Sequence, residues 1–463
     1  MPSGIATGEV TDNSAVIWSR SNRVARMHVA VVAEGRSFHD TVVVTQARDF
    51  TGKLVLAALE PGTRYEYAVW FTEPADGDAT LPEGTLRGSF LTAPAPGDAR
   101  AIRFAWSGDL GGQNACRDTR DGYAIFKPLA AGKYDFFIAM GDMIYSDTPC
   151  EAKGVFGNAQ FPLATRESTT LADFHAHWRY NREDPAYQSF LRQTSYFSVW
   201  DDHEVVNDWG PNTDFRMGPP YVPGAHLMAT GLRALLDYNP VREPLDQNRL
   251  YRRQRWGKHL ELFFLDTRQY RDDNKKPDSA RHPKQLLGQQ QLAWLVSELA
   301  ASNATWKVVV CSIPLSIPTG PGPEARDGFA DEGGKTGFEQ ELKSILTLLA
   351  QKDLSHTVWI TTDVHFASHF SYVPFPEKPG FVLDEFSAGP LSAGFFPKDK
   401  FDTTFHGKLT ASWANENSRT VASYPEARAL FNFGEVSITG AGALAVAIVN
   451  ADGRRVAEIP LSK

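Results

Sequence analysis

The first hundred residues alternate short apolar runs with turn residues. Five such runs, rich in Val, Ile, Tyr and Trp, cover residues 14–20, 27–33, 40–47, 52–59 and 63–71. β-branched and aromatic residues are typical of strands, and closely spaced strands with turn signals between them indicate a small sandwich. The pattern therefore predicts an all-β domain over residues 1–95. The stretch "TAPAPGDAR", which starts at Thr92, is the expected linker to the rest of the chain.

From residue 96 onward, strands alternate with helices. Apolar runs of strand length end in an acidic residue at Asp109, Asp142, Asp266 and Asp363. Leu and aromatic residues at helical spacing predict helices in 123–134, 284–302 and 341–352. Such alternation is typical of an α/β fold with largely buried strands. The last segment, 433–461, returns to strands, so we expect one large domain over residues 96–463.

The amino-acid composition limits the classes of function that this protein can have. The 463 residues are 42% hydrophobic, which allows a sizeable core and excludes wholesale disorder. The net charge is −8, with 47 basic and 55 acidic residues. A nucleic-acid binder needs a basic face, so this balance argues against one. It is compatible with a protein that concentrates carboxylates around cations.

The chain shows no signal for a membrane or for a disulfide framework. No stretch is apolar for long enough to span a bilayer, and "MPSGIATGEV" lacks the basic start and apolar run of a secretory leader. This start fits a cytoplasmic protein or an exported one without its leader. The three cysteines, Cys116, Cys150 and Cys311, allow one disulfide at most and leave at least one thiol that is buried or binds metal.

One stretch crowds ionisable side chains at a single point. In "SVWDDHEVVNDW", Asp201, Asp202, His203 and Glu204 follow an apolar run directly. Asp109, Asp142 and the pair Asp363 and His365 also stand where predicted core strands end. Ligands of open α/β sheets collect outside these strand ends. Several acids that meet there are stable only around cations, so the recurrence predicts a metal site.

The series "SGDLGGQ", "MGDMIYSD", "VWDDHE", "LDTRQYR" and "TDVHFA", in this order, resembles the alkaline phosphatase D (PhoD-like) family of calcineurin-like metallophosphoesterases. The resemblance covers nearly the whole chain. It implies an α/β fold in which a metallophosphoesterase-type β-sandwich is flanked by helices. The N-terminal stretch "LEPGTRYEYAVWF" resembles a fibronectin type III strand entry, so the small sandwich that precedes this fold is expected to be of the fibronectin III or immunoglobulin type.

The resemblance also implies roles for individual residues. It implies seven metal ligands, in chain order Asp109, Cys116, Asp142, Tyr145, Asp202, Asp363 and His365. Asp142 falls where the acid that bridges the metals lies, Tyr145 would give a phenolate, and Cys116 is the candidate thiolate. His203 is expected to face the leaving oxygen. Arg268 would either clamp a phosphoryl oxygen or act as the partner of an acid.

Thiolate and phenolate suit trivalent iron, whereas carboxylate and amide oxygens suit calcium. The expected cofactors are therefore Fe(III) and Ca(II), with manganese and zinc as alternatives. The amide of Asn207 is a candidate for completing a calcium site. His175 and His177 in "DFHAHW" have metal-like spacing, but i, i+2 residues of a helix do not face one another. We expect them not to bind metal, and Glu204 and Asp208 to lie outside the ligand set.

The expected activity is metal-dependent hydrolysis of phosphate esters, in which a metal-activated hydroxide attacks phosphorus in line. Phosphomonoesterase, phosphodiesterase and phospholipase D-like cleavage all fit such a centre, so the substrate is a small phosphate ester or a phospholipid head group. A different class, a non-catalytic secreted binding protein on the same scaffold, stays open. Family members are typically exported, so we expect a periplasmic or secreted protein, and a monomer.

Overall fold

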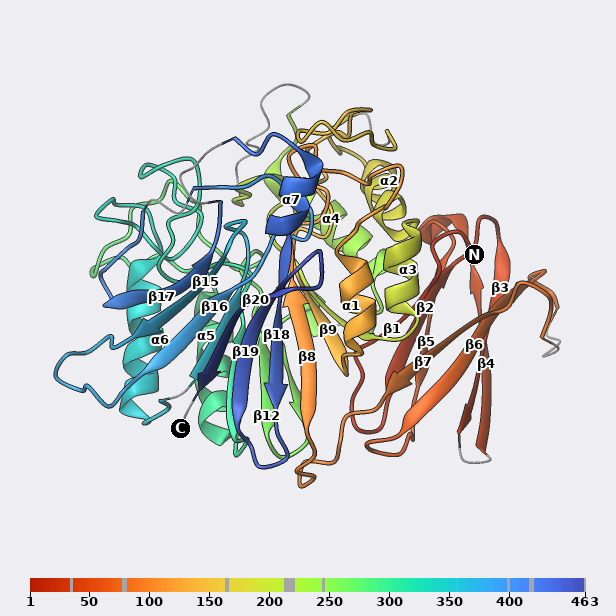
Figure 1. The fold of residues 1–463 in the computed structure, drawn as a ribbon, viewed down its shortest axis with the longest axis horizontal. Helices are drawn as coiled ribbons and strands as arrows, with labels where there is room; N and C mark the ends of the chain where they lie inside the picture. Colours follow the sequence, from red (N-terminus) through yellow and green to blue (C-terminus); the bar gives the residue numbers. More distant parts are fainter. Residues whose placement is uncertain are drawn as a thin grey trace.

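The computed structural model of the protein describes residues 1–33, 36–76, 81–162, 166–211, 221–243, 246–355, 357–397, 400–415 and 420–461. Two large β-sheets form the centre of the molecule, and a small third sheet lies at one end (Figure 1). Seven α-helices fall within the described residues. Short 3-10 turns occur at Gln46–Arg48 and Asp246–Asn248.

The larger sheet has nine strands. Their order is β20 (Arg455–Leu461), β19 (Leu444–Asn450), β18 (Asn432–Ile438), β8 (Ile102–Ser107), β9 (Phe136–Met140), β10 (Ser195–Val199), β1 (Ile5–Gly8), β2 (Ala15–Arg20) and β5 (Thr51–Leu56). β8, β9 and β10 at its centre are parallel. Their carboxyl ends therefore point the same way, which brings the loops that follow them to one edge.

The second sheet has seven strands. Their order is β11 (Arg252–Trp256), β12 (Leu260–Phe264), β13 (Trp306–Val310), β14 (Thr357–Thr361), β16 (Leu383–Ser387), β15 (Ala367–Tyr372) and β17 (Gly407–Trp413). The four strands from β12 to β16 in this order are parallel. Every residue of β12 and β14 is buried, as expected for strands covered on both faces.

The two large sheets pack face to face. The ring of Phe136 on β9 lies 4.5 Å from that of Trp256 on β11, and Phe197 lies 5.5 Å from Phe264. The next residue along β9, Phe137, points to the opposite face and packs against Phe190 of a helix. This alternation follows from the period of two in a strand. It gives the molecule a central apolar layer between sheets and two outer layers beneath helices.

The helices cover the outer faces. The nine-stranded sheet is packed against α1 (Phe126–Gly132), α2 (Leu171–Arg182), α3 (Pro185–Leu191), α4 (Gly224–Tyr238) and α7 (Tyr424–Leu430). The seven-stranded sheet is packed against α5 (Gly288–Ala301) and α6 (Glu339–Gln351). The helix expected over 284–302 begins only at Gly288, whose φ of 72° is incompatible with a helix that continues through it. The backbone N–H groups of Leu286 and Leu287 before it donate to the side chain of Glu341.

The N-terminal region is all-β, as the sequence predicts, but it is joined to the large sheet. Its four-stranded sheet has the order β4 (Arg36–Val44), β3 (Ala25–Ala33), β6 (Arg64–Thr72) and β7 (Leu86–Leu91). Its other three strands, β1, β2 and β5, continue the nine-stranded sheet through a parallel pairing of Gly8 with Tyr196. A Cβ on Gly8 would lie 2.5 Å from the Tyr196 carbonyl oxygen, so a glycine is needed at this junction.

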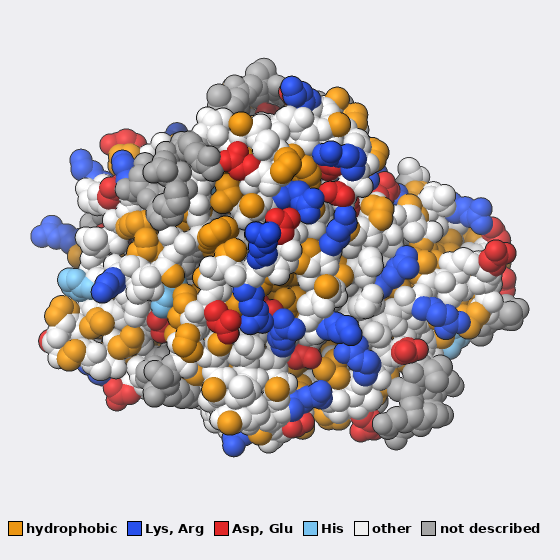
Figure 2. Space-filling view, viewed as in Figure 1, with side chains coloured by type: hydrophobic (Ala, Val, Ile, Leu, Met, Phe, Trp, Pro, Cys, Tyr) orange, Lys and Arg blue, Asp and Glu red, His pale blue; other side chains and the backbone are white. Residues whose placement is uncertain are grey.

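Basic and acidic side chains are mixed on the face seen in Figure 2. Several arginines of the described residues are paired with acids; Arg428 contacts Asp121 at 3.2 Å, and Arg103 bonds Glu435. None of the helices in the described part of the chain combines the length and the apolar character needed to cross a bilayer.

Candidate metal centre

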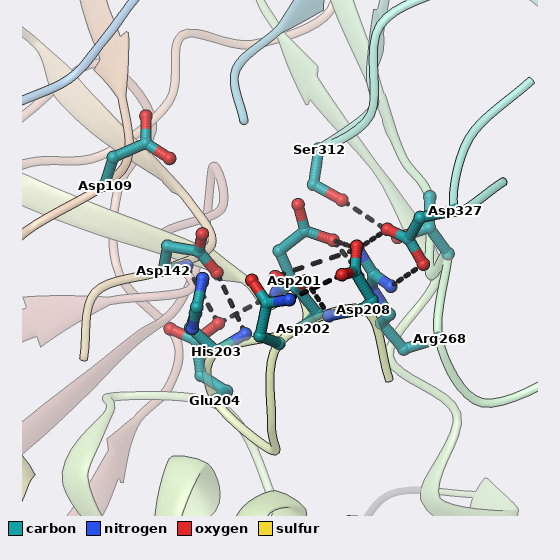
Figure 3. A network of polar contacts seen from close by, with 12 residues as sticks. Asp109, Asp142, Asp201, Asp202, His203, Glu204, Asp208, Arg268, Ser312 and Asp327 are labelled. Carbon is teal, nitrogen blue, oxygen red and sulfur yellow. Dashed lines mark hydrogen bonds and ion pairs between the residues drawn. The ribbon is translucent and has the colours of Figure 1, made fainter. Parts of the chain in front are cut away.

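Acidic loops from both sheets meet at one cavity. Asp109, Asp142 and Asp202 follow β8, β9 and β10, and Asp363 follows β14. In Figure 3 Asp109 stands at one end of the network, the pair Arg268 and Asp327 at the other, and Asp142 between them. The cavity has a volume of about 310 Å³. The ionisable side chains that line it are Asp142, Asp202, His203, Asp208, Asp363 and His365.

The carboxylates are close enough to share cations. Oxygens of Asp142, Asp201, Asp202 and Asp363 all lie within 4.8 Å of one another. Two further groups at this spacing are Asp142 with Asp202 and His203, and Asp202 with Asp208 and Asp327. Burial first, and then the neighbouring carboxylates, raise the pKa of Asp142 and of Asp363 well above the usual range. Unpaired carboxylates at such distances repel unless a positive charge lies among them.

Several carboxylate oxygens face the centre without a hydrogen-bond donor. Oδ1 of Asp109, Oδ1 of Asp202 and Oδ2 of Asp363 are enclosed and have no partner among the described residues. The remaining oxygen of Asp109 accepts a hydrogen bond from Thr362 Oγ1 at 2.7 Å. A buried polar atom that lacks a partner is costly, and oxygens are the ligands of hard cations. The donor set therefore fits bound metal ions.

The ligand loops have an unusual backbone. Asp109, Asp142, Asp363 and His365 have φ values of 63°, 52°, 76° and 55°. Residues other than glycine avoid this left-handed region, so the surrounding structure must hold them there. Gly141 next to Asp142 allows the close packing, because a Cβ on it would lie 2.6 Å from Cβ of Asp201. The strain turns the carboxylates off the strand ends and towards the cavity.

Glu204 fixes two of these loops from behind. Its Oε2 accepts hydrogen bonds from the backbone N–H of Asp142 at 2.9 Å and of Asp201 at 2.8 Å. Its Oε1 accepts one from the N–H of Met143 at 2.7 Å. Burial raises the pKa of Glu204 to about 8, in opposition to these three N–H donors. The side chain thus joins the loop after β9 to the loop after β10 without lining the cavity.

His203 is oriented by a carboxylate. Its Nδ1 lies 2.7 Å from Oδ1 of Asp147, and Oδ2 of Asp147 accepts the backbone N–H of Asn207 at 2.7 Å. Burial by itself would lower the pKa of His203, but the carboxylates of Asp147 and Asp202 raise it to about 10. With Nδ1 bonded to Asp147, the ring presents Nε2 as its second nitrogen, and the side chain lines the cavity.

Asp109, Tyr145 and His365 meet at the other end of the site. Nε2 of His365 lies 3.0 Å from the Tyr145 hydroxyl and 3.5 Å from Oδ1 of Asp109. Its Nδ1 lies 2.7 Å from the carbonyl oxygen of Gly394, which orients the ring. Burial and the surrounding carboxylates raise the pKa of Tyr145 well above its usual value. His365 is more than two hundred positions from both Asp109 and Tyr145 in the chain, yet its Nε2 approaches both side chains.

Comparisons with known proteins agree with this geometry. A family model described as PhoD-like phosphatase matches residues 104–443, and the model of the PhoD-like phosphatase N-terminal domain matches residues 1–94. The chain belongs to the PhoD-like phosphatase family. Alkaline phosphatase D of Bacillus subtilis (strain 168) is 27% identical over 392 residues, which cover 78% of this chain. The chain spans 64% of the length of that PhoD relative.

The fold of the family is also found among solved structures. A structure described as that of PhoD superposes with a TM-score of 0.74 at 20% identity, and the match covers 100% of this chain and 92% of that one. The small all-β N-terminal region and the two large sheets are therefore a shared architecture.

The structure of this PhoD-like chain contradicts the expectation that Cys116 is a thiolate ligand. Cys116 forms a disulfide with Cys150, 34 positions further along the chain, so its sulfur is not a thiolate ligand. The remaining cysteine, Cys311, is free and buried directly after β13, which matches one of the two alternatives expected for the unpaired thiol. The expected thiolate is thus wrong in this structure, because an oxidised sulfur has no charge with which to bind a metal.

Arg268 corrects a second expectation. Its side chain is fully buried and does not line the cavity. Nη1 and Nη2 donate to the two oxygens of Asp327 at 2.9 Å each, and Nε donates to Asp201 at 2.6 Å. These bonds direct the buried guanidinium to two acids and not into the cavity, so the observed contacts do not support the clamp. The alternative expectation, that Arg268 is the partner of an acid, matches the observed contacts.

The remaining sequence predictions concern two histidines, Asn207 and Asp208. Nε2 of His175 lies 3.0 Å from Asp237, and neither His175 nor His177 belongs to a potential metal group of the described residues. Asn207 lines the cavity, and its side-chain amide donates to Asp208. Asp208, expected outside the ligand set, also lines the cavity and belongs to a group that could hold a metal.

Sequence reasoning missed three contributors. Asp147 is part of the quoted "MGDMIYSD" and could have been found from its place five residues after Asp142. Asp327 stands in no recognisable motif, and only the fold brings it to Arg268. Asn181 of α2 is the third: its amide donates to the carbonyls of Leu110 and Met143 at 3.3 and 2.7 Å. It therefore ties the loop after β8 to the loop after β9.

Proposed function

We propose that this protein hydrolyses phosphate esters with the help of bound metal ions. The observation that carries the proposal is the set of enclosed carboxylate oxygens without a hydrogen-bond donor on Asp109, Asp202 and Asp363. Asp202 and Asp363 line the cavity, and Asp109 lies beside His365, which lines it too. Family membership supports phosphate esters as the substrate class. A non-catalytic scaffold would have no reason to keep acids at four strand ends, three of them, Asp109, Asp142 and Asp363, with a strained backbone.

We infer that Asp109, Asp142, Tyr145, Asp202, Asp363 and His365 hold the metals. The set consists mostly of oxygens and favours a hard cation such as Ca(II), while the phenol of Tyr145 favours Fe(III). Manganese and zinc are the alternatives. Because Cys116 is in a disulfide, the case for iron depends on Tyr145 alone. Asp208 and Asp327 are further carboxylates that could hold a second cation beside Asp202.

Bound cations would supply neutralisation of the phosphoryl charge and would acidify a water molecule. The protein's own residues supply the rest. His203 would protonate the departing alkoxide, and Asp147 would hold its ring so that Nε2 carries the proton to the cavity. Glu204 and Arg268 act one layer behind and keep Asp142 and Asp201 in place. Burial of these partners keeps the site rigid before substrate arrives.

The substrate would be a phosphomonoester, a phosphodiester or a phospholipid head group. We infer a periplasmic or secreted protein, and the disulfide between Cys116 and Cys150 supports an oxidising compartment. We propose a monomer that has no nucleic-acid-binding face. The pairing of surface arginines with acids supports the absence of such a face. We further propose two domains, 1–95 of the fibronectin type III kind and 96–463 with a sandwich of the metallophosphoesterase type.

The test combines metal content and turnover. Purified protein is analysed for iron, calcium, manganese and zinc, then assayed with p-nitrophenyl phosphate and bis(p-nitrophenyl) phosphate before and after treatment with a chelator. We expect the chelator to abolish turnover and the identified metals to restore it. Asp142→Asn should lose metal and at least about 10³-fold in kcat/KM, as expected when metal charge stabilisation is removed. Asp353→Asn, at an exposed acid, is the matched control.

Two outcomes would contradict the proposal. One is a metal-loaded protein that turns over neither ester. The other is Asp142→Asn with full metal content and the wild-type rate, which would show that Asp142 is not a ligand.

A further inference from the structure

The side chains that line the cavity at the metal centre are of two chemically different kinds. One set is acidic, is called the acidic wall below, and consists of Asp142, Asp202, Asp208 and Asp363. The other set is apolar, is called the apolar wall below, and consists of Ile317, Pro318, Pro321, Val364, Phe396 and Pro397. Metal binding and phosphoryl charge explain the acidic wall. They do not explain the apolar one, because apolar side chains contribute nothing to binding a phosphoryl group or a cation.

Phe396 is the most exposed large side chain of the apolar wall. Its exposed fraction is 43%, whereas most aromatic rings of this protein are buried. One face of its ring stacks on the ring of His365, with centroids 4.3 Å apart and an angle of 12° between the planes. The stack covers one face of Phe396 and leaves the remainder at the mouth of the cavity. An aromatic ring held this way offers a flat apolar surface.

The backbone that carries Phe396 is fixed to the metal loop. The backbone N–H groups of Leu391 and Ser392 donate to the carbonyls of Gly108 and Asp109, at 2.9 and 3.0 Å. Further along, the N–H of Gly394 donates to Oε1 of Gln113 at 3.0 Å. The ring of the next residue, Phe395, packs between Phe156 and Phe431, each at 5.4 Å. Phe395 thus anchors the segment, and Phe396 points to the other side.

The segment 315–321, which carries Ile317, Pro318 and Pro321 of the apolar wall, is fixed as well. The N–H of Leu315 donates to the buried carboxylate of Glu385 at 2.8 Å. The carbonyl of Ser316 accepts from the N–H of Asp402 at 2.8 Å, and that of Thr319 accepts from the N–H of Asp327 at 3.2 Å. Both parts of the wall are therefore formed before a ligand binds. A preformed apolar surface beside a few polar groups is typical of a small-molecule site.

We propose that the apolar wall recognises the organic group of the substrate, and that this group is an aryl or a compact alkyl group. It would lie on the free part of the Phe396 ring, towards Ile317 and Pro318, while the phosphoryl group lies at the acidic wall. Phe396 is then a specificity-determining residue for the proposed esterase reaction, on which this inference rests. The volume of about 310 Å³ has room for a phosphoryl group and one ring, so a longer chain would extend past Phe396 into solvent.

The experiment keeps the leaving group constant and changes the second alcohol. Metal-loaded protein is assayed with phenyl p-nitrophenyl phosphate and with 2,3-dihydroxypropyl p-nitrophenyl phosphate, which release the same phenolate. We expect the phenyl ester to have the higher kcat/KM. Phe396→Ala should lower kcat/KM for the phenyl ester roughly ten-fold, mainly through KM, and leave the dihydroxypropyl ester within about two-fold, because only the first ester loses aromatic contact area.

Two variants serve as controls. Phe396→Trp retains an aromatic face and should keep the preference for the phenyl ester. Phe161→Ala removes a ring of similar exposure, 41%, which lines a different cavity and should change neither ester. Binding is measured separately from turnover, by calorimetric titration of phenylphosphonate against methylphosphonate. Wild type should prefer phenylphosphonate, and Phe396→Ala should lose that preference.

The outcomes separate this inference from the proposed function. Equal kcat/KM for the two esters, with no effect of Phe396→Ala on either ester or on phosphonate binding, would overturn the inference and leave the esterase standing. If neither ester is hydrolysed, the proposed function fails, and the phosphonate titrations still decide whether Phe396 recognises an aryl group.

Discussion

Asp147 holds His203 by a hydrogen bond of 2.7 Å to its Nδ1, and both side chains are largely enclosed. A carboxylate in this position sets which ring nitrogen carries the proton and which way the ring faces. The pair thus resembles the carboxylate–histidine pairs that orient a proton donor in many hydrolytic sites. Its geometry links a residue of the loop after β9 to one of the loop after β10.

Asp147→Asn should lower kcat by roughly 10- to 100-fold with full metal content, because the ring loses its orientation. The loss should be largest for esters with poor leaving groups, which depend most on proton donation. The check is a series of aryl phosphates of increasing leaving-group pKa. In a His203→Ala background, Asp147→Asn should have no further effect on kcat. A second, additive loss would show that Asp147 acts independently of His203.

Glu204→Gln should weaken the frame of the site. Glu204 accepts three backbone N–H groups, and an amide offers only one oxygen, so at least one N–H would face an NH₂ donor. We expect the free energy of unfolding to fall by about 2–3 kcal/mol and metal affinity to fall about 10- to 100-fold. Urea unfolding and metal titration measure these changes. Glu458→Gln, at an exposed position, is the control, and wild-type metal affinity in Glu204→Gln would contradict the prediction.

The disulfide can be tested against the expected thiolate with two matched variants. Cys116→Ser and Cys150→Ser each break the same disulfide, whose two cysteines are 34 positions apart. Each should lose about 3–4 kcal/mol of stability, on the chain-entropy model of a closed loop, and both should keep their metals. Chemical unfolding and elemental analysis provide the readouts. If Cys116→Ser loses iron and Cys150→Ser does not, the result would support Cys116 as a thiolate ligand.

The start of α2 gives a prediction on pH. Asp173 lies in a capping box with Thr170; burial alone would raise its pKa, but hydrogen bonds from Thr170 and Arg166 lower it to about 2 from 3.8. A carboxylate whose pKa is lower in the folded state adds stability above pH 4, and this contribution disappears as the pH falls from 4 to 2. Asp173→Asn should cost about 0.5–1 kcal/mol near neutral pH.

The measurement for Asp173→Asn is urea unfolding at a series of pH values, with wild type and Asp353→Asn alongside. The difference in stability between wild type and Asp173→Asn should shrink between pH 4 and pH 2. A difference that stays constant over this interval would mean that the charge of Asp173 does not contribute.

The sequence was sufficient for features that depend on local pattern. A run such as "FFIAM" is apolar throughout because β9 is covered on both faces, and that run was readable without a structure. Asp109, Asp142, Asp202 and Asp363 were found because parallel strands bring their carboxyl ends to one edge. The motif order then led to the family, which the family models bear out.

The sequence was insufficient where the partner of a side chain lies on a distant element. Nothing near Arg268 in the chain shows that its donors go to Asp327 and Asp201, so the clamp and the ion pair looked equally good. The disulfide partner of Cys116 could not be predicted for the same reason, because pairing with Cys150 depends on how the loops after β8 and β9 lie. The continuity of β1 with β10 through Gly8 was likewise unreadable, since it needs only one close backbone approach.

What the sequence determined by itself is therefore the alternation of strands and helices, the acids at the strand ends and the chemistry that those acids can support. Periodicity and residue type are local properties, and they are written in consecutive positions. The tertiary structure alone decided which acids each basic side chain pairs with and which cysteines form the disulfide. It also decided that Phe396 lies over His365 at the mouth of the site. Those outcomes depend on distances between segments far apart in the chain, and only packing sets such distances.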